Sequence, residues 1–224
     1  TFSADENQTA IGTVTASDAD GDDITFSISG SEITIDASSG VLTFVTAPDY
    51  ETKTSYSATV TASDGTNSTT QDITVNVTNV NDNSPSITSS ATFTAEENQT
   101  AIGTVTATDA DGDGITFSIS GSDITIDASS GVLTFVSAPD YETTTSYSAT
   151  VTASDGTNST TQDITVNVTN VNDNSPSITS SATFSADENQ TAIGTVTASD
   201  ADGDDITFSI SGSEITIDAS SGVL

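Results

Sequence analysis

The chain has 224 residues, and its 33 acidic side chains against one lysine give a formal net charge of −32. This charge excludes nucleic acid and anionic membranes as partners, because both are bound through Lys and Arg. The chain has no Cys and no His, which excludes disulfides, thiol-ligated metals and imidazole chemistry, and no run of about 18 apolar residues predicts direct membrane insertion.

A 91-residue unit is repeated almost three times along the chain. Residues 1–91 and 92–182 differ at seven positions, and residues 183–224 repeat 1–42 without a change. A fixed long period indicates an array of similar domains rather than one large domain. Each full copy carries a net charge of −12, so the array repels itself unless cations bind.

Short β-strands are predicted throughout each copy. Apolar and polar residues alternate with a period of two, and many are β-branched, which is typical of half-buried antiparallel strands. In the first copy the predicted strands cover residues 9–16, 24–28, 33–35, 41–45, 56–62 and 73–77, and the next copy opens with a strand over 87–93. With no amphipathic helical stretch, the fold class expected is all-β, as tandem immunoglobulin-like β-sandwiches.

A polar linker separates the copies. It reads Asn-Val-Asn-Asp-Asn-Ser-Pro at Asn79–Pro85 and again at Asn170–Pro176. The Ser-Pro step disfavours helix and gives an extended connection. These linkers predict domains at 1–83 (first strand missing), 84–174 (complete) and 175–224 (truncated).

Four short acidic clusters recur in the copies that contain them. In the first copy they are Asp5-Glu6-Asn7, Asp18-Ala-Asp20, Asp49-Tyr-Glu51 and Asp64-Gly65. Ca²⁺ takes about six to eight oxygen ligands from carboxylates, Asn side chains and carbonyls. No single cluster supplies that many, but several clusters at one end of a sandwich do.

The order of these motifs resembles the cadherin repeat, in the form found in bacterial surface proteins. Glu-Asn, Asp-Ala-Asp, Asp-Tyr-Glu, Ala-Ser-Asp-Gly and Asn-Asp-Asn-Ser-Pro follow one another at similar spacing over the whole unit. The resemblance implies Greek-key sandwiches with Ca²⁺, up to about three ions, at each junction between repeats. It also implies an extracellular or cell-surface location.

The resemblance assigns metal ligands by motif position. At the first junction they are Glu6, Asp49, Glu51, Asn79, Asn81, Asp82, Asn83, Asp109, Asp111 and Asp155. At the second they are Glu97, Asp140, Glu142, Asn170, Asn172, Asp173, Asn174, Asp200 and Asp202. In the first copy, Asp18, Asp20 and Asp64 would face a preceding repeat, whereas Asp22 and Asp23 are expected to be solvated loop acids.

Three features depart from the family pattern. The first linker position is Asn79 or Asn170 where the family has Asp, which keeps an oxygen but removes a charge, so calcium should bind more weakly there. The spacing from Glu6 to Gly12 is also one residue longer than in most animal cadherins, so Asp5 is an alternative to Glu6 or shares its role. In addition, the chain has no Trp, which removes the Trp-anchored strand exchange of animal cadherins.

Two other readings of the acidic motifs are weaker. Residues 109–114 match the start of an EF-hand loop, but the twelfth position is Ser120 and no helices flank it. Paired carboxylates also occur in glycosidases. Repetition of the pairs in each copy argues against catalysis, and an enzyme is not expected.

The sequence therefore predicts a calcium-rigidified extender or stalk segment of a long extracellular adhesin or surface fibre. The alternative is a self-associating repeat that forms an adhesive or matrix filament. The expected partners are neighbouring repeats of the same chain in the first case, and identical chains in the second.

Overall fold

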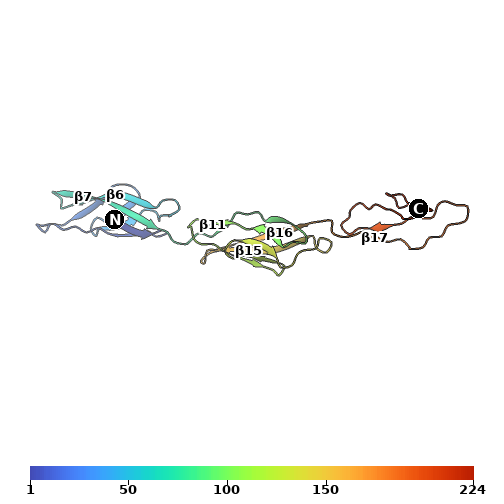
Figure 1. The fold of residues 1–224 in the computed structure, drawn as a ribbon. Helices are drawn as coiled ribbons and strands as arrows, with labels where there is room; N and C mark the ends of the chain where they lie inside the picture. Colours follow the sequence, from blue (N-terminus) through green and yellow to red (C-terminus); the bar gives the residue numbers. More distant parts are fainter. The chain divides into compact units, whose positions relative to one another are not determined.

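The structure is a computed structural model that describes residues 1–224 (Figure 1). It consists of β-strands, turns and loops, which confirms the all-β prediction. It contains no helix that is long and apolar enough to cross a membrane. The contacts divide the chain into two compact units. The first unit consists of Thr1–Ser86, Ala107–Ile115 and Ala153–Thr160. The second consists of Ile87–Thr106, Thr116–Thr152 and Thr161–Leu224. The first unit thus includes two segments from the second copy of the sequence.

The first copy forms two sheets. Its strands are β1 (Phe2–Asp5), β2 (Ala10–Thr13), β3 (Thr25–Ile28), β4 (Ile33–Ile35), β5 (Val41–Phe44), β6 (Ser55–Ser63) and β7 (Ser68–Thr78). One sheet has the order β1-β7-β6-β3 and the other the order β2-β5-β4. β1 runs parallel to β7, whereas β7 pairs with β6 in the antiparallel sense. These crossovers between sheets are typical of a β-sandwich.

One apolar core joins the two sheets of the first copy. Leu42 and Phe44 of β5 pack in the same cluster as Val60 of β6 and Ile73 and Val75 of β7, and none of the five is more than 4 % exposed. Alternate residues of each strand point to opposite faces, so the apolar set lies inside and the polar set outside.

The second copy repeats this arrangement. Its strands are β8 (Ser86–Ile87), β9 (Thr92–Glu96), β10 (Ala101–Thr104), β11 (Ala107–Thr108), β12 (Thr116–Ser120), β13 (Ile124–Ile126), β14 (Val132–Phe135), β15 (Ser146–Ser154) and β16 (Ser159–Thr169). The sheets have the orders β12-β15-β16-β9, β10-β14-β13 and β11-β8. Leu133 and Val166, both fully buried, occupy the places of Leu42 and Val75.

The predicted strand over 87–93 is wrong as a single element. β8 ends at Ile87, and β9 begins at Thr92 in a different sheet. The Ser90 hydroxyl accepts the Thr92 backbone N–H at 3.0 Å. Such a local side-chain bond competes with the strand ladder and lets the chain change sheets.

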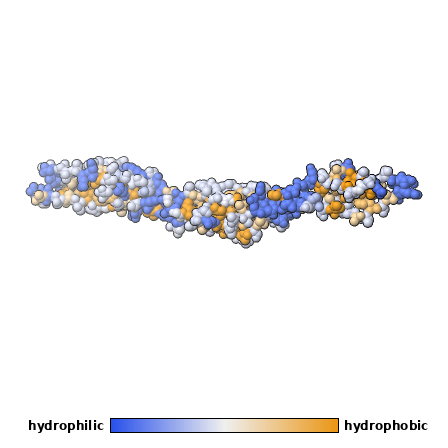
Figure 2. Space-filling model, viewed as in Figure 1, coloured by the Kyte–Doolittle hydropathy of each residue, from blue (hydrophilic) through white to orange (hydrophobic).

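Residues 175–224 contain little regular structure. β17 (Ser177–Ile178) pairs with β18 (Ala198–Ser199), and one isolated bridge joins Thr195 to Val223. Ile178 is 71 % exposed there. Figure 2 shows hydrophobic groups on the surface toward the C-terminal end.

Candidate metal centre

Glu6 is a buried carboxylate that connects three segments of the first unit. It directly follows β1 and is 3 % exposed. Its Oε2 accepts the backbone N–H of Tyr50 at 2.8 Å, and its Oε1 accepts that of Val80 at 2.8 Å. Glu97 of the second unit is equally buried and accepts the corresponding pair of N–H groups. These bonds fix the orientation of both carboxylates.

A group of four carboxylates occurs in each unit. Oxygen atoms of the four residues lie within 4.8 Å of one another, in the sets Glu6, Glu51, Asp82 and Asp111, and Glu97, Glu142, Asp173 and Asp202. Like charges at this distance disfavour ionisation. Desolvation raises the pKa of Glu51, and the charges of Glu6 and Asp111 raise it further. A bound cation would remove this repulsion.

Asp111 accepts the largest number of hydrogen bonds in the first group. Its Oδ2 accepts the backbone N–H of Asp82 at 3.1 Å and that of Asn83 at 2.9 Å. Its Oδ1 accepts the Asn83 Nδ2 at 3.0 Å, and this side-chain bond is the main reason that the pKa of Asp111 is lowered. Asp202 makes the same set of contacts in the second unit. The charged form of both residues is therefore favoured.

Two other expected ligands have oxygen atoms without a hydrogen-bond partner. The Oδ2 atoms of Asp109 and Asp155 are buried, and neither accepts a hydrogen bond. The Oδ1 of Asp155 is satisfied by the backbone N–H groups of Thr157 at 2.7 Å and Asn158 at 2.6 Å. Since a buried carboxylate oxygen loses its hydration, it requires a compensating donor or cation.

The donor chemistry of these residues fits a calcium ion. Ca²⁺ takes about six to eight oxygen ligands at about 2.3–2.6 Å. The two groups offer carboxylate oxygens, with Asn and backbone oxygens beside them, and the chain has no thiol or imidazole to favour a softer metal. The unpartnered oxygens of Asp109 and Asp155 support the same fit.

Amide side chains hold the first linker against the loops of the same unit. Asn158 donates from Nδ2 to the Asn81 Oδ1 at 2.9 Å and to the Asn83 backbone oxygen at 3.2 Å. Asn7, whose φ is 62°, donates from Nδ2 to the Asp82 carboxylate. The linker position is thus fixed by neutral donors as well as by acidic residues.

Several expected ligands lie outside the four-carboxylate groups. Asp49 caps its own turn, with Oδ1 accepting the Thr52 N–H at 3.1 Å and Oδ2 accepting the Thr52 hydroxyl at 3.0 Å. Asp140 does the same with Thr143. Asn172 is exposed in the second linker.

Two acidic residues near the sites were not expected from the sequence. Asp113 lies with Asp109 and Asp111, and Asp204 lies with Asp200 and Asp202, with oxygens within 4.8 Å of one another in each set. Their counterpart in the first copy, Asp22, was expected to be a solvated loop acid. The Asp-x-Asp-x-Asp spacing at 109–113 was the available signal.

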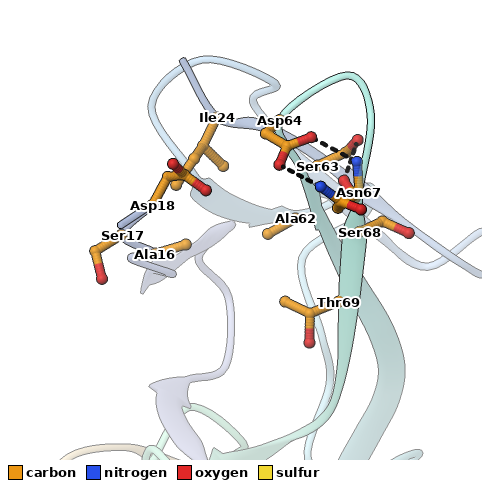
Figure 3. A pocket seen from close by; sticks show the side chains of 10 residues that line it. All are labelled: Ala16, Ser17, Asp18, Ile24, Ala62, Ser63, Asp64, Asn67, Ser68 and Thr69. Atoms are coloured by element: carbon orange, nitrogen blue, oxygen red, sulfur yellow. Dashed lines mark hydrogen bonds between the residues drawn. The ribbon is translucent and has the colours of Figure 1, made fainter. Parts of the chain in front are cut away.

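The first copy has an open cavity of about 220 Å³ at the end that corresponds to Asp109 and Asp155 of the second copy. Asp18 and Asp64 both line it, and Figure 3 shows Asp64 bonded to the turn that contains Asn67. The Asp64 Oδ1 accepts the N–H groups of Thr66 at 2.7 Å and Asn67 at 2.6 Å, and these bonds, the Asn67 one first, lower the pKa of Asp64. Asp20 donates its N–H to the Asp18 Oδ1 at 2.8 Å.

Comparison with known proteins finds similarity to one protein family over most of this chain. The Cadherin domain family model matches residues 1–78 and 90–169. Human protocadherin Fat 1 is 37 % identical over 178 residues, which is 69 % of this chain and 4 % of that protein. The chain therefore spans a small part of the length of this relative.

Solved cadherin structures resemble nearly the whole chain. The crystal structure of mouse cadherin-23 EC22-24 has a TM-score of 0.77 at 25 % identity, covering 99 % of this chain and 83 % of that one. A cis-dimer structure of protocadherin gammaB7 EC3-6 has a TM-score of 0.74 at 25 % identity, covering 92 % and 59 %. Cadherin domains are extracellular adhesion modules that bind Ca²⁺ at the junctions between repeats. On the match of both full copies to the family model, this chain belongs to the cadherin domain family and lies outside the cell.

Proposed function

We propose that the chain is a calcium-rigidified extender segment of a long extracellular adhesin or surface fibre. The observation that carries the proposal is the four-carboxylate group, which recurs with the same residues and spacing in both units. Without metal each group brings acids together that repel one another. Calcium at these positions joins the linker to the sandwich before it and to the loops of the copy after it.

The proposed ligands are those assigned from the motifs, with Asp113 and Asp204 as additions. Up to about three ions at each junction would add about +6 against −12 per copy, so metal would offset about half of the self-repulsion. The proposed repeat boundaries are 1–83, 84–174 and 175–224. Each repeat would serve as a spacer, with no catalytic role.

Calcium binding and thermal stability test this proposal. A ligand that binds only the folded state stabilises it by mass action, so the melting temperature should rise with calcium concentration. Mg²⁺ at the same ionic strength is the control, because it demands a smaller and more regular octahedral site. A melting temperature that is equal in calcium, magnesium and chelator would contradict the proposal.

Self-association is the second candidate function. It is favoured by the similarity to protocadherin gammaB7 EC3-6, whose solved structure is a cis-dimer. In that case identical chains would be the partners, and the array would itself be the adhesive or filament-forming element. The net charge of −32 opposes this association unless calcium or salt reduces it.

A further inference from the structure

The first residue of each linker makes a direct bond that involves no metal. Asn79 donates from Nδ2 to the backbone oxygen of Asp111 at 2.8 Å. Asn170 donates in the same way to the backbone oxygen of Asp202 at 2.7 Å. An Asp at either position could not make this bond, because an ionised carboxylate offers only acceptors.

The same loop residue also holds the linker backbone. The Asp111 carboxylate accepts the N–H groups of Asp82 and Asn83, while its carbonyl accepts the Asn79 amide. Both sides of Asp111 are therefore bonded to the linker. Each of these bonds has its donor and acceptor on the chain itself, so none of them requires a bridging ion.

We propose that Asn79 and Asn170 are amide clamps that keep each linker on its loop when calcium is absent. Asn in place of Asp also removes one negative charge from each junction, and calcium affinity follows the charge of the ligands. The clamp therefore lowers the calcium affinity of the junction, and it keeps the linker ordered when no metal is bound. The claim that Asn lowers calcium affinity rests on the proposed function, whereas the claim that the amide bond orders the linker without metal does not.

Replacing both clamps by aspartate separates the two effects. In the full chain, Asn79→Asp with Asn170→Asp should speed hydrogen exchange of the Asp82 and Asn83 amides in chelator by about fivefold, as expected for the loss of one hydrogen bond. The same variant should bind calcium roughly tenfold more tightly in a calorimetric titration, because each junction gains one negative charge. The matched control is Asn76→Asp with Asn167→Asp, which adds the same charge at exposed positions of β7 and β16.

The two measurements test the clamp and the calcium affinity independently. Linker exchange in chelator that is as slow as in the wild type would overturn the clamp. Calcium affinity that is unchanged, or raised equally by the control variant, would overturn the role of Asn in lowering affinity. Faster linker exchange in a protein that binds no calcium in any variant would support the clamp and contradict the proposed function.

Discussion

The Glu6 Oε1 accepts the backbone N–H of Val80 at 2.8 Å, across 74 positions of the sequence. This bond ties the end of β1 to the start of the linker, beside the bond from the Glu6 N–H to the Thr78 oxygen at 3.2 Å. The carboxylate can hold this orientation only when β1 is paired with β7. A metal that uses Glu6 would therefore bind the folded state selectively and stabilise it.

Substitution of Asp82 should impair one junction and leave the sandwiches folded. Asp82 is exposed, and its carboxylate contacts Asn7 and Asn83 within the first unit. Asp82→Ala should remove about half of the calcium-dependent rise in stability, since the second junction remains intact. Calorimetric calcium titration and thermal unfolding measure both effects. Asp22→Ala is the control, and equal losses of calcium binding in the two variants would show that the ligand assignment is wrong.

Substitutions of two separate glycines in the second copy, one in a crowded position and one in open space, test the packing of the sandwich. Gly131 has φ +71°, and a Cβ there would lie 2.2 Å from the Val105 oxygen. Gly131→Ala should lower the free energy of unfolding by more than about 1 kcal/mol, because both the backbone conformation and the space are unsuitable. Gly114 has open space around it, and Gly114→Ala should change stability by less than about 0.5 kcal/mol. Chemical denaturation compares the two, and equal effects would contradict the close approach to Val105.

Acid should reveal the contribution of the Asp36 turn. The pKa of Asp36 is lowered from 3.8 to about 2 by hydrogen bonds to its carboxylate. The largest contribution comes from the backbone N–H of Ser39, followed by the Ser39 hydroxyl and then by the hydroxyl and N–H of Ser38. A carboxyl with a lowered folded-state pKa contributes stability that is present above its unfolded value and lost as the pH falls through the folded value. Asp36→Asn should therefore be less stable than the wild type at pH 7, and the difference should shrink between about pH 4 and pH 2. Denaturation of both proteins across this range measures it, and a difference independent of pH would refute the assignment.

The sequence predicted the class of fold because its apolar residues follow a period of two. Ile33–Ile35 is β4 with the bounds that were expected, and Leu42 and Phe44 are core residues of the predicted strand at 41–45. The same pattern missed the first half of β7, where the polar residues 68–72 pair with β6 and expose their side chains. Strand pairing there does not depend on burial, so hydrophobic periodicity could not reveal it.

The candidate site was predicted from motif order rather than from periodicity. Glu6, Glu51, Asp82 and Asp111 come from four distant segments, and only the strand topology decides that their oxygens converge. The direction of an amide cannot be obtained from sequence either. The sequence predicts Asn79 as an oxygen ligand, and in the structure its Nδ2 donates to the Asp111 carbonyl. Position in a motif specifies which residues meet, but not which atoms face one another.

The state of association distinguishes a stalk from a self-adhesive repeat. A stalk should remain monomeric in calcium at high concentration, because about −6 per calcium-loaded copy still opposes side-by-side contact. A filament-forming array should assemble, and faster when salt screens the charge. Sedimentation velocity in calcium at low and high salt measures this. Concentration-dependent polymers would favour the second candidate function over the first.

The central claim is that calcium makes the array rigid, and small-angle scattering of the full chain tests it most directly. The account predicts a stiff, extended particle in calcium and a wider distribution of end-to-end distances in chelator, with the sandwich secondary structure unchanged by circular dichroism. The amide clamps should leave some linker order in chelator, so the change should be larger in the Asn79→Asp, Asn170→Asp variant than in the wild type. Identical scattering profiles in calcium and chelator, for both proteins, would contradict the account.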